Sequence, residues 1–172
     1  MTTAATTLLL VRHGETVDNV RHIMQGQTQG QLTRHGREQA ATLGDKLARC
    51  HIDAFVASDL RRATDTCRMI AQRHGGTVAV TPLLRERDWG SFTGRYIPGL
   101  KDVPWPDDIE SEAALKERAA RFLEWVRSRY PGQTVLAVGH GIINKAIQSV
   151  LHDKPMRDVE RMDNAEVRTL TI

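Results

Sequence analysis

Cysteine is scarce in this sequence. Cys50 and Cys67 are the only two among 172 residues. Two cysteines do not form a disulfide framework of the kind that stabilises small secreted domains. Both lie on or near expected helices, and we expect buried, reduced thiols in a cytoplasmic protein.

Long hydrophobic runs and blocks of like charge are also absent. No apolar run approaches the roughly 20 residues that cross a bilayer, and residues 1–6 lack the basic segment that begins a signal peptide. The 24 Lys and Arg residues are interspersed with 21 Asp and Glu residues, which leaves a net charge of +3. We therefore expect neither a membrane nor a nucleic-acid partner. A few arginines gathered in one pocket would suit a small anionic substrate.

Several enzyme motifs are missing as well. The sequence has no Gly-x-x-x-x-Gly-Lys-[Ser/Thr] and no Gly-x-Gly-x-x-Gly, which excludes nucleotide-binding folds built on those loops. It has no Gly-x-Ser-x-Gly elbow. No His-x-x-x-His pair or carboxylate-rich cluster indicates a metal site, so we expect no metal and no cofactor.

Short apolar runs alternate with amphipathic segments along the chain. Runs typical of strands occupy residues 7–11, 54–57, 78–80, 134–138 and 166–172. Helical spacing follows most of them, and another helix follows His140. Helix caps are expected at Thr33, Ser58-Asp59 and Ser111, and helix ends near Arg49, Gly75-Gly76 and Pro131-Gly132. This alternation predicts one domain, residues 1–172, with an α/β fold: a three-layer α/β/α sandwich around a mostly parallel sheet.

Two segments show no clear period. Residues 17–31 are polar and are interpreted as a loop over the site. The stretch between Arg85 and Asp108 contains three prolines and half of the aromatic residues, including Trp89 and Trp105. Long loops of this kind are often functional, so we interpret this one as a lid or specificity loop, with a packed surface loop as the alternative.

The tripeptide Arg-His-Gly occurs three times, so it is uninformative by itself. His35 falls in the first turn of a helix and His74 in a last turn, where solvated structural roles are expected. His13 and His140 differ because each directly follows a buried strand. Parallel strands end at the same edge of a sheet, where ligands collect, so these two histidines can face one pocket. Two structural histidines at strand ends remain the alternative.

Three more polar side chains are expected at this edge. Arg12 precedes His13, and Glu86 follows the third strand. Arg62 lies one turn into a helix, where its side chain leans back over the end of strand 54–57; the alternative is an exposed arginine, the role we expect for Arg61. Two arginines, two histidines and one carboxylate would form an anion-binding cluster that can transfer protons.

These residues fall within motifs that resemble the histidine phosphatase (phosphoglycerate mutase-like) superfamily. The resemblance runs in order from about Leu8 to Ile172. It is carried by Arg12-His13-Gly14-Glu15-Thr16 with Asn19, Leu32-Thr33-Arg34-His35-Gly36 with Gln39-Ala40, Ser58-Asp59-Leu60-Arg61-Arg62-Ala63, Glu86-Arg87-Asp88-Trp89-Gly90 with Gly94, and Val138-Gly139-His140-Gly141.

The resemblance implies a phosphomonoesterase that works through a phosphohistidine. His13 would be the nucleophile, with its other ring nitrogen held by a backbone carbonyl in the Gly14 turn. Arg12, Arg62 and His140 would bind the phosphoryl oxygens, and Glu86 would act as acid and then base. The substrate contacts expected with these are Asn19, Gln25, Gly26, Gly141 and Ile142.

Departures from the family pattern refine this expectation. Gln29 stands where the family often has Asp, and Ile142 is bulkier than the residue often found there. Tyr96-Ile97 replaces the Asn-Lys of cofactor-dependent mutases, which favours a phosphatase. Mutase-type phosphoryl transfer and a non-catalytic phosphate-ligand sensor remain as alternatives. The expected partner is a small phosphomonoester, and the sequence favours neither a monomer nor a homodimer.

Overall fold

The computed structural model describes residues 4–172, so the first half of segment 1–6 lies outside the described residues. Five strands form one sheet in the order β3-β2-β4-β1-β5. The parallel strands are β1 (Thr7–Arg12), β2 (Ala54–Ser58), β3 (Val78–Thr81) and β4 (Thr134–Gly139). The last strand, β5 (Val167–Thr171), pairs antiparallel with β1. The predicted mostly parallel sheet is confirmed.

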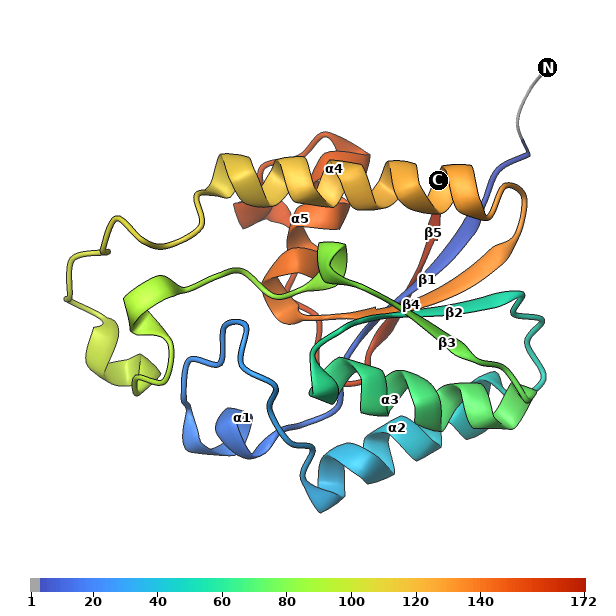
Figure 1. The fold of residues 1–172 in the computed structure, drawn as a ribbon, viewed down its shortest axis with the longest axis horizontal. Coiled ribbons are helices and arrows are strands. Elements are labelled where there is room, and N and C mark those ends of the chain that lie inside the picture. The colour runs from blue at the N-terminus through green and yellow to red at the C-terminus, as the bar shows by residue number, and fades with distance from the viewer. Residues whose placement is uncertain (1–3) are drawn as a thin grey trace.

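Helices cover both faces of the sheet (Figure 1). One face carries α2 (Arg34–Leu47) and α3 (Arg61–Ala71), and the other carries α4 (Glu112–Arg129) and α5 (Gly141–His152). Each helical layer encloses its own hydrophobic core against the sheet. Strands buried on both faces have near-continuous apolar sequences, which is why β1 and β4 are recognisable from sequence. The predicted α/β/α sandwich is confirmed. Within the described residues, no helix has the length and apolar character of a membrane span.

Two of the three expected helix caps are found. Thr33 accepts a hydrogen bond from the N–H of Gly36, and Ser111 accepts one from Ala114. The Ser58-Asp59 cap was wrong: α3 begins at Arg61 behind Leu60, with no side-chain cap from that residue. Asp59 instead forms an ion pair with Arg85 at 2.6 Å. The side chain of Asp59, which the local pattern predicted as a helix cap, therefore pairs with an arginine that is distant in the chain.

Some smaller expectations need correction, whereas others are confirmed. Residues 17–31 contain a short helix, α1 (Val17–Arg21), rather than only loop. The expected helix end at Gly75-Gly76 agrees with the structure, because α3 continues as a 3-10 turn, Gln72–His74, and Gly75 caps that turn in the left-handed conformation. Cys67 is buried, and burial raises the pKa of its thiol to about 12, whereas Cys50 is exposed, contrary to expectation. The other 3-10 turns are Pro82–Leu84, Gly90–Phe92, Ile97–Leu100 and Met156–Asp158.

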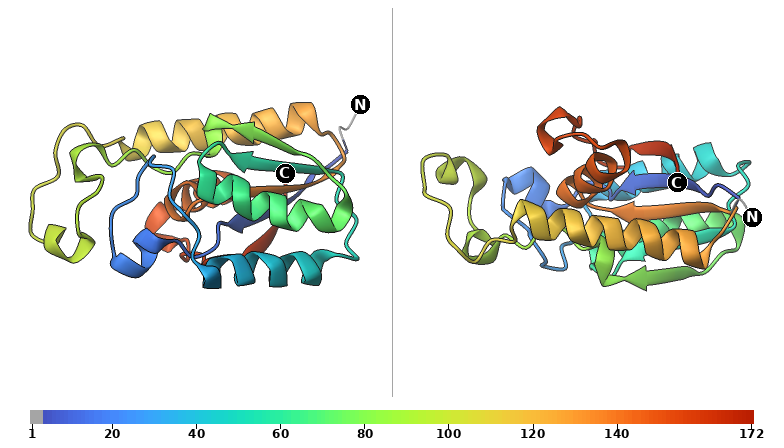
Figure 2. Two further views of the ribbon diagram at one scale, coloured as in Figure 1. Left: turned by 60° about the horizontal axis from the view of Figure 1, so that its bottom comes forward. Right: turned by 90° about the horizontal axis from the view of Figure 1, so that it is seen from above.

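The carboxyl ends of the parallel strands lie at one end of the molecule, where both irregular segments also lie (Figures 1 and 2). The two segments are joined by backbone hydrogen bonds. The N–H of Met24 donates to the carbonyl of Arg95 at 2.9 Å, and the N–H of Gly94 donates back to Met24 at 2.8 Å. The loop between Arg85 and Asp108 is thus tied to the loop that follows α1.

Gly36 allows the turn after β1 to pack closely on α2. A Cβ atom at residue 36 would overlap the carbonyl oxygen of Glu15, and one at Gly14 would lie 2.5 Å from the carbonyl oxygen of Gly36. We expect Gly36→Ala to lower the free energy of unfolding by about 2 kcal/mol or more, since backbone must move. Urea denaturation measures this, with Gly99→Ala as the control, because a Cβ there has no neighbour closer than 3.9 Å. Equal effects of the two substitutions would contradict this account.

Candidate active site

The ends of β1 and β4 bring His13 and His140 together. The two strands are neighbours, with Arg12 in register with Gly139, so the next residue on each strand is a histidine. The ring centroids are 5.1 Å apart and the planes are inclined by 61°. Both rings are buried. The expected pairing of two histidines at one sheet edge is therefore present in the structure.

One hydrogen bond sets the tautomer of His13. Its Nδ1 lies 2.7 Å from the carbonyl oxygen of Gly14. A carbonyl oxygen only accepts, so Nδ1 carries the proton and donates. In the neutral ring Nε2 then has a free lone pair. This is the arrangement that a nucleophilic histidine requires.

Burial and neighbouring cations keep the two histidines neutral. Burial lowers the pKa of His13 well below its usual value, and the charges of Arg62 and Arg12 lower it further. Burial, followed by the charge of Arg62, likewise lowers the pKa of His140. Near neutral pH both rings are therefore uncharged.

The two arginines approach the histidines from different elements. Arg12 ends β1 and donates from its guanidinium to the carbonyl of Met162 at 2.7 Å. Arg62, the second residue of α3, donates to the carbonyls of Gly26, at 2.7 Å, and Thr28. Burial lowers the pKa of Arg62 to about 10, so it stays charged at neutral pH. The expectation that Arg62 would be buried over the site, rather than exposed, agrees with its position.

Several buried polar side-chain atoms at this site have no partner. Among the described residues, the Nε of Arg12, the Nε of Arg62 and both ring nitrogens of His140 make no hydrogen bond. A buried donor without a partner is costly, and it is satisfied when a ligand supplies the acceptor. Cationic donors gathered in this way indicate an anionic ligand.

Glu86 lies at the amino end of α5. Its carboxylate accepts hydrogen bonds from the N–H groups of Ile142 and Ile143, at 3.1 and 3.0 Å, and of Arg87 at 2.9 Å. The unpaired N–H groups and positive dipole end of a helix are suited to a carboxylate. Glu86 was expected over the site, but its partner was not, because β3 and α5 are far apart in the chain.

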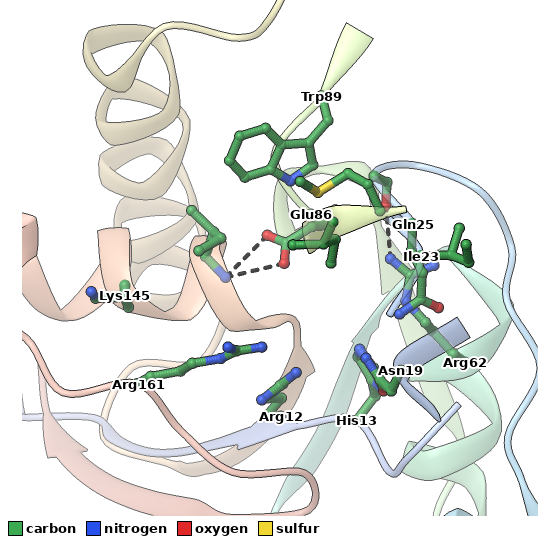
Figure 3. Close-up of a pocket in the computed structure, with 14 residues that line it drawn as sticks. Arg12, His13, Asn19, Ile23, Gln25, Arg62, Glu86, Trp89, Lys145 and Arg161 are labelled. Atoms are coloured by element: carbon green, nitrogen blue, oxygen red, sulfur yellow. Dashed lines mark hydrogen bonds between the residues drawn. The ribbon is translucent and has the colours of Figure 1, made fainter. Parts of the chain in front are cut away.

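These side chains surround a cavity of about 240 Å³ (Figure 3). Of the residues expected to bind substrate or react, the lining includes Arg12, His13, Asn19, Gln25, Gly26, Arg62, Glu86 and Ile142. His140 is fully buried and does not line the cavity, and Gly141 lies close to Arg12 and Glu86 without lining it. Within residues 4–172, no group of three or more His, Cys, Asp or Glu side chains is placed to hold a metal ion.

Six lining residues were not singled out from sequence as substrate contacts. They are Ile23, Met24, Trp89, Ile97, Lys145 and Arg161. Lys145 could have been predicted to line the cavity, because it lies one helical turn after Gly141. Arg161 could not have been predicted, because the segment before β5 has no regular hydrophobic period and reaches the cavity only through tertiary folding.

Gln29 does not face the cavity. Its side-chain oxygen accepts a hydrogen bond from the N–H of Arg61 at 2.9 Å, and its backbone carbonyl accepts from Arg62. Gln29 therefore caps α3, the helix for which Ser58-Asp59 had been expected to supply the cap. The cap of α3 therefore comes from a residue that is distant in the chain.

The aromatic loop forms a small cluster of its own beside the cavity. The rings of Trp89 and Trp105 meet edge to face with centroids 5.4 Å apart, and the guanidinium of Arg87 lies 5.0 Å and 5.1 Å from the Trp89 and Trp105 centroids. Of the loop's aromatic residues, only Trp89 lines the cavity. That this loop selects the substrate stays a prediction.

The neutral histidines predict how stability depends on pH. In the unfolded chain His13 and His140 bind protons below about pH 6.5, whereas the folded chain, with both pKa values lowered, does not. The unfolded state then holds more protons, so the free energy of unfolding falls as the pH drops below 6.5, by up to about 1.4 kcal/mol per histidine per pH unit.

Urea denaturation between pH 5 and 7 measures this slope. His13→Asn should reduce the slope by about one histidine's share, that is, about 1.4 kcal/mol per pH unit. An unaltered slope in His13→Asn would contradict the account of a neutral, buried ring.

Comparison with known proteins agrees with this geometry. The model of the histidine phosphatase superfamily (branch 1) matches residues 8–172. A metal-independent phosphoserine phosphatase of Arabidopsis thaliana is 33% identical over 159 residues, which cover 83% of this chain and 67% of that protein. A "Probable phosphoglycerate mutase GpmB" of Enterobacter sp. (strain 638) is 39% identical over 160 residues, covering 85% and 74%.

A solved structure gives the same result. The mycobacterial glucosyl-3-phosphoglycerate phosphatase in complex with VO3 superposes with a TM-score of 0.87 at 28% identity, covering 95% of this chain and 90% of that one. The fold and site define a phosphomonoester hydrolase. The chain belongs to the histidine phosphatase superfamily, within its phosphoglycerate mutase-like phosphatases.

Proposed function

We propose that this protein hydrolyses a small phosphomonoester, without a metal ion, through a phosphohistidine on Nε2 of His13. The observation that carries the proposal is the 2.7 Å hydrogen bond from Nδ1 of His13 to Gly14, because it leaves Nε2 free to attack. Arg12 and Arg62 hold the phosphoryl oxygens, and the buried His140, whose ring nitrogens have no partner beside His13, donates to a phosphoryl oxygen once the group is bound. The name of the Arabidopsis relative supports independence from metal ions.

The reaction has two displacement steps. In the first, the lone pair of Nε2 forms a bond to phosphorus, the ester P–O bond breaks, and Glu86 donates a proton to the leaving alkoxide. In the second, Glu86 takes a proton from water, the water oxygen attacks phosphorus, and the P–N bond breaks. The guanidinium groups stabilise the charge that spreads over the phosphoryl oxygens in each transition state.

Phosphate release from a panel of phosphomonoesters tests this proposal. The panel includes O-phosphoserine and 3-phosphoglycerate, which the relatives' names indicate. Release that persists in EDTA supports the proposal. Movement of the phosphoryl group within the substrate, without release, would favour a mutase, and no turnover on any substrate would favour a phosphate-ligand sensor.

Arg118 is predicted to position Glu86. From α4, its guanidinium donates to the carbonyls of Leu83, at 3.0 Å, and Arg85, at 2.6 Å, and it pairs with Glu110 at 2.8 Å. Arg118→Lys keeps the positive charge but loses the planar guanidinium that makes these hydrogen bonds simultaneously. We expect kcat for an alkyl phosphate to fall about ten-fold, the cost of a lost charged hydrogen bond.

Substrates with different leaving groups distinguish a loss of Glu86 positioning from a general loss of activity. The p-nitrophenolate ion leaves without a proton, so the rate of the first step, measured as the burst of p-nitrophenolate, should fall much less in Arg118→Lys than kcat for the alkyl phosphate. Arg121→Lys, at an exposed position of the same helix, is the control. Equal losses in the p-nitrophenolate burst rate and in kcat for the alkyl phosphate would assign Arg118 a purely structural role.

A further inference from the structure

The cavity contains more positive charge than the proposed reaction uses. Four cationic side chains line it, from Arg12, Arg62, Lys145 and Arg161, against one carboxylate, from Glu86. Arg12 and Arg62 are assigned to the phosphoryl group. Lys145 and Arg161 have no part in the two displacement steps.

Lys145 and Arg161 lie together on one side of the cavity. Lys145 lies one turn into α5 and is partly buried, and Arg161 precedes β5. Figure 3 shows the guanidinium of Arg161 beside Arg12, with Lys145 beyond it, on the side away from Arg62. Burial, followed by the charge of Arg161, lowers the pKa of Arg12, which is consistent with this proximity.

Neither side chain has an acidic partner. Within residues 4–172, no carboxylate lies within 4.0 Å of the Lys145 ammonium or the Arg161 guanidinium. Acidic residues are nearby in sequence, but Glu166 pairs with Arg168 at 3.0 Å instead. Like charges close together in a partly enclosed cavity repel, and an anion placed between them removes that cost.

Part of the cavity lining is apolar. It is formed by Ile23, Met24, Trp89 and Ile97. A substrate bound with its phosphoryl group at His13 therefore meets both cationic and apolar side chains.

We propose that Lys145 and Arg161 form a subsite for a second anionic group on the alcohol part of the substrate. This inference rests on the proposed function, because the phosphoryl group must occupy the space at His13. The arginine fork binds a carboxylate or phosphoryl group through two parallel hydrogen bonds, and the lysine adds a point charge. The physiological substrate is then a small phosphomonoester that carries a carboxylate or a second phosphoryl group.

Matched pairs of substrates test this proposal. The pair 3-phosphoglycerate and glycerol 3-phosphate differ only by a carboxylate in place of a hydroxymethyl group. The pair 1,3-propanediol bisphosphate and 3-hydroxypropyl phosphate differ by a second phosphoryl group. The measurement is the ratio of kcat/KM within each pair, which cancels effects on the shared phosphoryl group and distinguishes the two kinds of anion.

The wild-type protein should prefer the more anionic member of at least one pair. Lys145→Met and Arg161→Gln should each reduce that preference about ten-fold, as expected for the loss of a charge-assisted hydrogen bond. Lys154→Met and Arg157→Gln remove the same charges from exposed positions outside the cavity and should preserve the preference.

Two outcomes would overturn the subsite. One is a wild-type protein that does not discriminate within either pair, and the other is an equal loss of preference in the cavity variants and the exposed controls. Hydrolysis of p-nitrophenyl phosphate that depends on His13 would persist in both cases. If that hydrolysis is itself absent, the proposed function fails rather than the subsite.

Discussion

Replacing His13 with alanine is expected to lower phosphate release by about 10⁴-fold or more, because the substitution removes the nucleophile of both displacement steps. Arg12, Arg62 and Glu86 still line the cavity, so the variant should bind phosphomonoesters while failing to turn them over. Stopped assays of phosphate release give the rate, and titration calorimetry with the same ester gives the affinity.

His35→Ala is the matched control. His35 lies in another Arg-His-Gly tripeptide, but its side chain is exposed on α2, so activity should be unchanged. In the wild-type protein, acid-quenched phosphoenzyme should prove acid-labile and alkali-stable, as a P–N bond is. Substantial turnover in His13→Ala, or an acid-stable adduct in the wild type, would exclude a histidine nucleophile.

The sequence was sufficient to locate His13 and His140 because both follow strands buried on two faces. Such strands have near-continuous apolar sequences that stop abruptly, and parallel strands end at one edge. The tripeptide itself carried no information, since His35 and His74 share it. Context along the chain separated the two site histidines from the exposed His35 and the partly buried His74.

Contacts between distant elements could not be read from local pattern. The ion pair of Asp59 with Arg85 and the cap that Gln29 provides for α3 both replaced a predicted local cap. Arg161 reaches the cavity from a segment with no regular period. Glu86 was placed over the site correctly, but its contact with α5 depends on how two distant elements pack.

Arg62 shows how one buried side chain links the loop to the proposed chemistry. Its guanidinium donates to the carbonyls of Gly26 and Thr28, while its Nε is buried without a partner. The same group thus holds the loop that supplies Gln25 and Gly26 to the cavity and faces the space assigned to the phosphoryl group. In the proposed mechanism one side chain, Arg62, therefore contacts both this loop and the phosphoryl group.

Glu86→Gln is expected to slow hydrolysis of an alkyl phosphate by about 10²- to 10³-fold, the usual contribution of a general acid. The amide oxygen of glutamine can still accept hydrogen bonds from Ile142 and Ile143, so the local structure should persist. What is lost is the proton for the leaving alkoxide.

An aryl ester separates the two roles of Glu86. With p-nitrophenyl phosphate the first step needs no acid, whereas the second still needs a base to take a proton from water. Glu86→Gln should therefore release a burst of about one equivalent of p-nitrophenol and accumulate the phosphoenzyme. Because the amide neither donates nor accepts the transferred proton, a variant that loses no rate on alkyl esters and shows no burst would remove Glu86 from the mechanism. The contacts of Glu86 at the amino end of α5 would then be structural.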